Sequence, residues 1–349
     1  MIEIDGSYGE GGGQIVRSAL SLSCLFRKPF RIFNIRKGRK KPGLMPQHLT
    51  CVRAAQIISG AEVKGDHAGS TELLFSPKEV KGGYFSFDIG TAGSTSLVFQ
   101  TLIPALAFSQ QKTILTLKGG THVPFSPSFH YLSGIFIHFL EQLGIRVQIA
   151  IESYGFYPKG GGIVRADIFP PKNIKPLRII ERGSILRLTG YSAVGNLPLP
   201  IAERQKDALV KRINYEIKDI KVSPLIELLE VPSMGQGTFV YLESRAQHSI
   251  AGFTALGARG KKAEVVGEEA AEEFVKYYTT GAALDYHMAD QIILYLSMCN
   301  EESSFTTSAI TKHLITNLWV IGLFHKIQYS IEGEVGEKGL VKIKGKKDK

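Results

Sequence analysis

The chain alternates short β-type stretches with longer amphipathic segments, and glycines or prolines separate most of them. Apolar residues recur with a helical period from Gln14 to Phe26, whereas Phe30 to Ile35 alternates like a strand. These patterns predict a first unit of order βαβαββ. Its elements are a strand at 2–5, a helix at 14–26, a strand at 30–35, a helix at 47–59, and extended segments at 61–63 and 72–75.

The same order of elements is predicted twice more. The second helix of each unit begins near a histidine, His48, His130 or His313, and the last interval is about 100 residues longer than the first. We therefore predict an insertion in the third unit, although ordinary α/β alternation without a repeat stays an alternative. The further predicted elements are strands at 84–88, 113–117, 146–152, 162–168, 304–307, 327–331 and 340–343, and helices at 97–108, 129–143, 283–298 and 310–324.

The extra segment, 177–280, has its own alternation of strands near 186–190 and 238–243 with helices at 202–213 and 268–278. Prolines and glycines mark its borders. We predict a mixed α/β (α+β) fold with a main domain of three repeated βαβαββ units, residues 1–180 plus 281–349, and a small inserted α/β domain, residues 181–280. The length of 349 residues suits two domains.

The composition, 44% hydrophobic and 21% charged residues, is typical of a soluble globular protein. No apolar run reaches the roughly 18 residues that span a bilayer, and the acidic start at Met1–Asp5 does not resemble a signal peptide. We therefore expect a cytoplasmic protein without a membrane partner. Cys24, Cys51 and Cys299 are isolated in apolar, helical surroundings, which indicates small core residues in a reducing compartment.

The formal net charge of +10 favours a polyanionic partner such as nucleic acid. Part of this charge belongs to the basic tail Lys342–Lys349, which could equally be a solvated end. Charge alone therefore leaves nucleic-acid binding open.

The glycine-rich run Gly9–Gln14 lies between a predicted strand and a predicted helix. Bare amides and a helix N-terminus in this place can bind phosphate, although the run is neither a Walker loop nor a dinucleotide fingerprint. Glu10 would repel phosphate unless it holds a divalent cation that bridges to it. The alternative is a plain tight turn with an exposed glutamate.

Cations follow this run along the chain. Arg17 comes about one helical turn later, and Arg36–Lys41 contains five cations in six residues. Arginine suits a terminal phosphate because its planar fork donates two parallel hydrogen bonds, but a solvated basic loop is an equal alternative. A second glycine cluster, Tyr157–Gly162, is more simply a hairpin turn around Lys159.

Polar residues on otherwise apolar helices are the remaining candidates. His287, Asp290 and Gln291 share one helix face and could stack on a base and bind its edge. Gln100 needs a partner if it is buried. His313, at the start of a helix, could be a nucleophile, although a lone helical histidine is more commonly an ordinary core or surface residue. The sequence contains no Ser-His-Asp, HExxH or zinc pattern.

Taken together, these segments resemble the RNA 3'-terminal phosphate cyclase family, and they follow the family's order nearly from end to end. The family's fold, three βαβαββ units with an inserted α/β domain, agrees with the repeat predicted above. The matching segments are Glu10–Ser18, Asn34–Arg39, Lys41–Leu44, Gln47–Leu49, Gly90–Thr95, Gly119–Thr121, Gly155–Gly162, Ala255–Lys261, His287–Gln291 and His313–Asn317.

The resemblance implies an ATP-dependent reaction. The histidine matching His313 attacks the α-phosphate of ATP, releases pyrophosphate and carries AMP covalently. The AMP then passes to an RNA 3'-terminal phosphate, and the neighbouring 2'-hydroxyl expels AMP to give a 2',3'-cyclic phosphate. Attack needs a neutral imidazole, so activity is expected to fall as the pH drops well below about 6.5.

The resemblance also implies roles for individual residues. Glu10 would bind a divalent metal, Mg²⁺ or Mn²⁺, and His287 would stack on the adenine. RNA with a 3'-phosphate is the implied partner. His122 and His130 stand where we expect acidic or amide residues, which leaves RNA or metal contacts there open. The residues implied to hold ATP are Gln100, Pro127, His287, Met288, Ala289, Asp290 and Gln291, and those implied to hold the RNA phosphate or triphosphate are Arg17, Arg36 and Arg39, with Gln47 nearby.

Two other functions stay open at this point. A non-catalytic RNA or ribosome assembly factor of the same fold would lack the nucleophilic histidine, so His313 and the intact His287–Gln291 motif favour an enzyme. A sugar-phosphate transferase of a related repeat architecture is the third hypothesis. The sequence leaves open the biological RNA, the preferred metal and nucleotide, the role of the inserted domain, and whether the chain forms a homo-oligomer.

Overall fold

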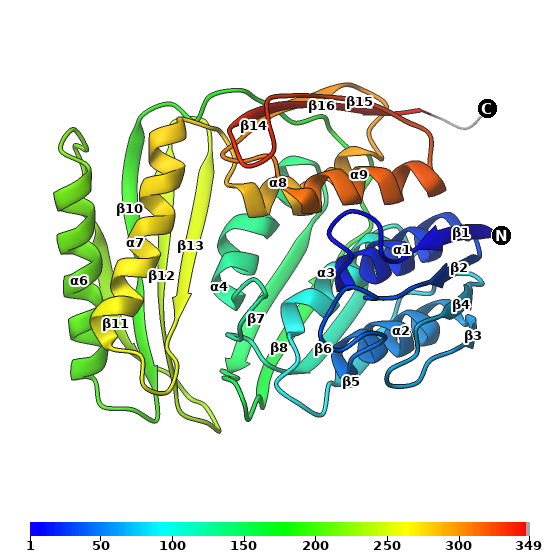
Figure 1. Cartoon of the computed structure of the whole chain (residues 1–349), viewed down its shortest axis with the longest axis horizontal. Helices are drawn as coiled ribbons and strands as arrows, with labels where there is room; N and C mark the ends of the chain where they lie inside the picture. Colours follow the sequence, from blue (N-terminus) through cyan, green and yellow to red (C-terminus); the bar gives the residue numbers. More distant parts are fainter. Residues whose placement is uncertain (347–349) are drawn as a thin grey trace.

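The structure is a computed structural model that describes residues 1–346, and it contains four sheets of four strands each (Figure 1). The first unit covers its sheet with two helices, as predicted. Its elements are β1 (Ile2–Asp5), α1 (Gly13–Phe26), β2 (Phe30–Phe33), α2 (Pro46–Ser59), β3 (Glu62–Lys64) and β4 (Leu73–Ser76).

The second unit repeats this order, but its second helix is irregular. The helix predicted at 129–143 contains one π-helical turn, which divides it into three short pieces. The elements are β5 (Tyr84–Asp88), α3 (Thr95–Ala107), β6 (Thr113–Gly119), α4 (Phe129–Tyr131), η1 (Leu132–Phe136), α5 (Ile137–Gln142), β7 (Val147–Ser153) and β8 (Gly162–Ile168).

The third unit includes a first strand, β9 (Arg178–Ile179), that was not predicted because two residues carry no periodic pattern. Residues 342–345 of the basic tail are not a free end, because they belong to the last strand. Lys347–Lys349 lie outside the described residues. The other elements are α8 (Tyr286–Leu296), β14 (Ser303–Thr307), α9 (Lys312–Phe324), β15 (Ile327–Glu332) and β16 (Gly339–Gly345).

The sheets of the three units have one topology. Their strand orders are β1-β2-β4-β3, β5-β6-β8-β7 and β9-β14-β16-β15. In each sheet the first pair is parallel and the other two pairs are antiparallel. The predicted repeat and fold class are therefore confirmed.

The three histidines lie near the starts of their helices, as predicted, but His48 lies one residue further along its helix than the other two. The N-caps of α2, α4 and α9 are Met45, Ser128 and Thr311, so His130 and His313 are each the second residue of their helix. The second residue of α2 is Gln47, and His48 follows it. The ring Nδ1 of His48 instead accepts a hydrogen bond of 3.1 Å from the backbone N–H of Met45.

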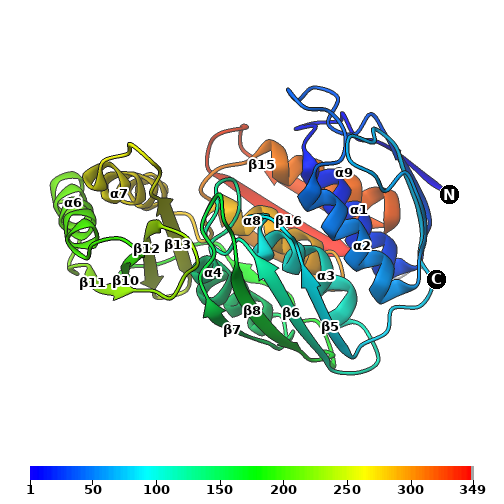
Figure 2. The same cartoon turned by 90° about the horizontal axis from the view of Figure 1, so that it is seen from below.

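The helices of the three units pack against one another and form one continuous hydrophobic core. Helix α1 contacts α2, α3 and α9, and α8 contacts α9 (Figure 2). The thiols of Cys24, Cys51 and Cys299 are buried and unpaired, which confirms them as core residues, although Cys299 follows α8 rather than lying in a helix. The starts of α1, α8 and α9 are thereby brought together.

The inserted segment forms its own sheet, of order β11-β10-β12-β13, covered by α6 and α7 over a separate hydrophobic core. It lies beside the three repeats in both views (Figures 1 and 2). The exact domain boundaries stay a prediction. Its elements are β10 (Ile185–Gly195), α6 (Pro200–Glu216), β11 (Leu225–Glu230), β12 (Gly237–Ala246), β13 (Ile250–Leu256) and α7 (Ala263–Thr280).

Among residues 1–346, no helix combines the length and the apolar character that crossing a bilayer requires.

Candidate functional site

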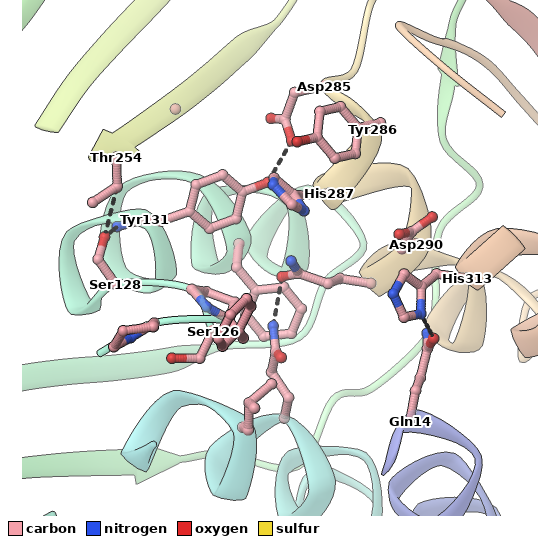
Figure 3. Close-up of a pocket in the computed structure, with 18 of the residues that line it drawn as sticks. Gln14, Ser126, Ser128, Tyr131, Thr254, Asp285, Tyr286, His287, Asp290 and His313 are labelled. Atoms are coloured by element: carbon pink, nitrogen blue, oxygen red, sulfur yellow. Dashed lines mark hydrogen bonds between the residues drawn. The ribbon is translucent and has the colours of Figure 1, made fainter. Parts of the chain in front are cut away.

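A cavity of about 760 Å³ lies where the three units meet the inserted segment (Figure 3). This volume is within the range of roughly 300–1,000 Å³ that is typical of ligand pockets. The starts of α1, α8 and α9, part of α3, the loop 123–128 and the end of β13 all contribute to its wall. The candidate residues that line it are Arg17, Gln100, Pro127, His287, Asp290, Gln291 and His313.

His313 lies at the start of α9 with its ring facing Gln14 at the start of α1 (Figure 3). The ring Nδ1 contacts the side-chain Oε1 of Gln14. Because an amide oxygen only accepts, this contact places the ring proton on Nδ1 and leaves a lone pair on Nε2. Burial, followed by the charges of Arg17 and Arg39, lowers the pKa of His313 below its usual 6.5, so the ring is neutral at neutral pH.

Asp290 connects α8 to the start of α9, which carries His313. Thr311 is the N-cap residue of α9, and its hydroxyl donates a 2.5 Å hydrogen bond to Oδ1 of the Asp290 side chain. The backbone carbonyl of Asp290 accepts a 2.8 Å hydrogen bond from Asn317, whose own Oδ1 accepts one of 2.7 Å from Ser18. Burial raises the pKa of Asp290 to about 8. Although Asp290 lines the cavity, these contacts show that it also orients the start of α9.

The amides of Gln100 and Gln291 join α3 to α8 across the cavity. Gln100 Nε2 donates to Gln291 Oε1 at 2.5 Å, which satisfies the expectation that a glutamine within an apolar helix needs a partner. The remaining polar atoms of both amides belong to residues of the cavity wall. They can therefore bind the polar edge of a ligand.

His287 presents an aromatic surface in the cavity. Its ring lies beside the Tyr286 ring, with 4.0 Å between the centroids, and the side chain is exposed (Figure 3). Surrounding protein lowers the pKa of His287 to about 4, so this ring is also neutral. Met288 and Ala289 differ from it, because both are fully buried in the core and neither lines the cavity.

Arg17 is one of the cations of the cavity wall. Within residues 1–346 it makes no hydrogen bond or ion pair through its guanidinium, so the group is available to an anion. Arg36 differs, because its guanidinium donates to the carbonyls of Lys41 and Gly43 at 2.6 and 3.1 Å and so holds its own loop. Neither Arg36 nor Gln47 lines the cavity.

Glu10 and Arg39 form an ion pair with each other outside the cavity wall. The backbone N–H of Glu10 donates to the Thr316 hydroxyl at 3.3 Å, which holds the glycine run against α9 one turn after His313. Among residues 1–346, no three histidine, cysteine, aspartate or glutamate side chains are grouped as metal ligands. Glu10 therefore supplies a single carboxylate, which suits a cation only together with the oxygens of a bound phosphate.

Several residues of the site were not predicted. The position of Gln14 directly after the glycine run could have marked it as a site residue. Its contact with His313, however, depends on how α1 packs against α9. Tyr131 and Asp285 also line the cavity, where the tyrosine hydroxyl donates to the carboxylate at 2.7 Å. Residues 252–258 and Lys261 of the inserted segment complete the wall. This contribution of the inserted segment to the cavity wall becomes visible only when the segment is packed against the three repeated units.

His122 and His130 lie outside the cavity wall, in an aromatic cluster between the second unit and the inserted sheet. The His122 ring stacks on Phe239 with 4.1 Å between centroids, and the Tyr154 hydroxyl lies 3.2 Å from His130 Nε2. Burial lowers the pKa of both histidines, that of His130 to about 4. Both rings are thus neutral groups that pack at the interface.

Comparison with known proteins gives a consistent result over the whole chain. The family described as "RNA 3'-terminal phosphate cyclase" matches residues 8–331. A protein of that name from Methanopyrus kandleri is 42% identical over 99% of both chains. One from Sulfolobus acidocaldarius is 46% identical over 95% of this chain and 97% of its own, and one from Pyrococcus abyssi is 41% identical over 98% of both.

Proposed function

This chain belongs to the RNA 3'-terminal phosphate cyclase family, and we propose that it uses ATP to convert the 3'-terminal phosphate of RNA into a 2',3'-cyclic phosphate. The observation that carries the proposal is the neutral His313 ring, held through Nδ1 by Gln14 in a cavity that also contains the unpaired guanidinium of Arg17. A non-catalytic assembly factor would not require this arrangement.

The first step forms a covalent intermediate on His313. Nε2 attacks the α-phosphorus of ATP, a nitrogen–phosphorus bond forms, and the bond to the bridging oxygen breaks, so that pyrophosphate leaves with the electron pair. Gln14 holds the proton on Nδ1 and stabilises the positive charge that develops on the ring. Arg17 stabilises the charge on the phosphate oxygens.

The next steps transfer AMP and close the ring. An oxygen of the RNA 3'-phosphate attacks the α-phosphorus, and the nitrogen–phosphorus bond to His313 breaks. The neighbouring 2'-hydroxyl then attacks the activated 3'-phosphorus, AMP leaves, and the hydroxyl proton passes to solvent. Adenylation is needed because it replaces a poor leaving group with AMP.

The cavity wall suggests how ATP is held. His287 and Pro127 would contact the faces of the adenine, and the Gln100–Gln291 amide pair would bind polar edges of the nucleoside. Glu10 would hold Mg²⁺ or Mn²⁺ with the phosphates, and the cation would offset their charge. Met288 and Ala289 would support this site from the core rather than touch the nucleotide.

The proposal predicts strict dependence on the RNA end. An RNA oligonucleotide with a 3'-phosphate should yield a cyclic end and one AMP per end, because the phosphate must accept the adenylate. The same oligonucleotide with a 3'-hydroxyl should release none. Separation of labelled RNA ends and nucleotides measures both products. Equal reaction of the two ends, or cyclisation without AMP, would contradict the proposed substrate.

The pH dependence of the first step gives a second prediction. Only the neutral ring attacks, and the pKa of His313 lies below 6.5, so the midpoint of the acid decline in the rate of ATP-dependent labelling should lie below pH 6.5. This places the decline below the value expected for an unperturbed histidine. Single-turnover labelling across the pH range, with circular dichroism to monitor folding, measures it. A midpoint above 6.5 would refute the neutral-ring assignment.

A further inference from the structure

An exposed aromatic residue, Phe125, lies on the cavity wall and has no role in the steps above. Its side chain is fully exposed, at 104% relative exposure, and its backbone φ is +61°, a left-handed conformation that non-glycine residues rarely adopt. The hydroxyl of Ser126 donates to the Val123 carbonyl at 3.0 Å and braces the turn. The loop 123–128 thus holds a bare phenyl ring out into solvent at the cavity.

An adjoining part of the wall comes from the inserted segment. Its loop between β13 and α7 contributes Ala258 and Lys261 to the cavity wall. The two parts of the wall are joined by the Ser128 and Thr254 hydroxyls, 2.9 Å apart (Figure 3). Phe125 and this loop therefore belong to one cavity, although they come from different parts of the fold.

The same loop carries three cations, Arg259, Lys261 and Lys262, which differ in their bonding. Lys261 is engaged, because its Nζ donates to the Leu256 carbonyl at 2.9 Å and pairs with Glu269. Arg259 and Lys262 are exposed, and neither side chain makes an ion pair or hydrogen bond within the described part of the chain. These side chains are available to phosphate.

A bare aromatic ring and unpaired cations, on two loops that line one cavity, form the combination that binds single-stranded nucleic acid, because bases stack on the ring while phosphates pair with the cations. We propose that the Phe125 loop and the β13–α7 loop form a subsite for the RNA strand that leads to the reacting end. One base stacks on Phe125, and Arg259 and Lys262 bind the backbone. This inference rests on the proposed function and assigns the inserted segment a part in RNA binding.

Direct binding tests the subsite without any catalytic step. The probe is a fluorescein-labelled RNA of about ten nucleotides with a 3'-phosphate, measured by fluorescence anisotropy without ATP. Phe125→Ala should weaken binding about tenfold, and Phe125→Trp should retain it, because both aromatic rings stack. Arg259→Ala should weaken binding and lower the slope of log affinity against log salt by about 0.7.

Matched controls lie away from the cavity. Tyr84→Ala removes another exposed aromatic side chain, on β5, and Lys221→Ala removes another exposed cation of the inserted segment. Neither should change RNA affinity. Unchanged affinity in Phe125→Ala and Arg259→Ala, or an equal loss in the controls, would overturn the subsite.

The nucleotide is the competing occupant of Phe125. If the ring bound adenine, Phe125→Ala would reduce ATP-dependent labelling of the protein and leave RNA affinity unchanged, which would also overturn the subsite. Failure of the unmodified protein to become labelled by ATP would instead contradict the proposed function. The RNA-binding measurement would still test the subsite in that case, because it requires neither ATP nor a catalytic step.

Discussion

Replacement of His313 by alanine is expected to reduce ATP-dependent labelling of the protein by more than about 10³-fold, because the variant lacks the only atom proposed to bond to AMP. The measurement uses ATP labelled in the α-phosphate with Mg²⁺ or Mn²⁺, followed by denaturing electrophoresis. The label should be lost in acid, because a histidine phosphoramidate is acid-labile. Cyclisation of 3'-phosphorylated RNA should fall to the same extent.

The matched control is His67→Ala, which removes an exposed histidine outside the cavity wall. It should label like the unmodified protein. Persistent labelling of His313→Ala would show that another residue is the nucleophile. The absence of any adduct in the unmodified protein under both metals would refute the covalent route altogether.

Replacement of Arg17 by methionine is expected to lower the labelling rate by about 10²-fold, because a guanidinium that stabilises developing phosphate charge is lost. Methionine keeps much of the apolar stem. The same variant should raise the pKa of His313, since the charge of Arg17 is one of the causes that lower it. The acid decline of the labelling rate should therefore move to higher pH.

Arg36→Met is the control for this variant, because the Arg36 guanidinium is already bonded to carbonyls of its own loop and does not line the cavity. It should affect labelling less than Arg17→Met does. If both variants lost labelling equally while the acid decline did not move, Arg17 would act through the fold of α1 rather than through charge.

The repeated architecture could be predicted because each unit repeats the same order of periodic segments. The exact alignment could not, since it depends on where each helix begins. The N-cap at Met45 makes Gln47, rather than His48, the counterpart of His313. Strand β9 is defined by its pairing with β14, a contact that a two-residue sequence pattern cannot reveal.

Site residues were predicted best where several of them lie on one face of the same helix. His287 and Gln291 line the same cavity as His313, as their shared helix face suggested. Met288 and Ala289 are neighbours of His287 in sequence, but the helical period turns both into the core. The contact between Gln14 and His313 joins residues about 300 positions apart, and only the packing of α1 against α9 creates it.

The position of the insertion has a consequence for the order of folding. Arg178 pairs with Ser304, so the third sheet cannot close until the chain has returned from the inserted segment. The separate core of that segment can form first and bring its two ends together, and the loop then costs less entropy to close. Thr306 donates to the Ile180 carbonyl at 2.6 Å where the ends meet. Because residues 252–258 of the inserted part line the cavity, the cavity is complete only when that part has folded.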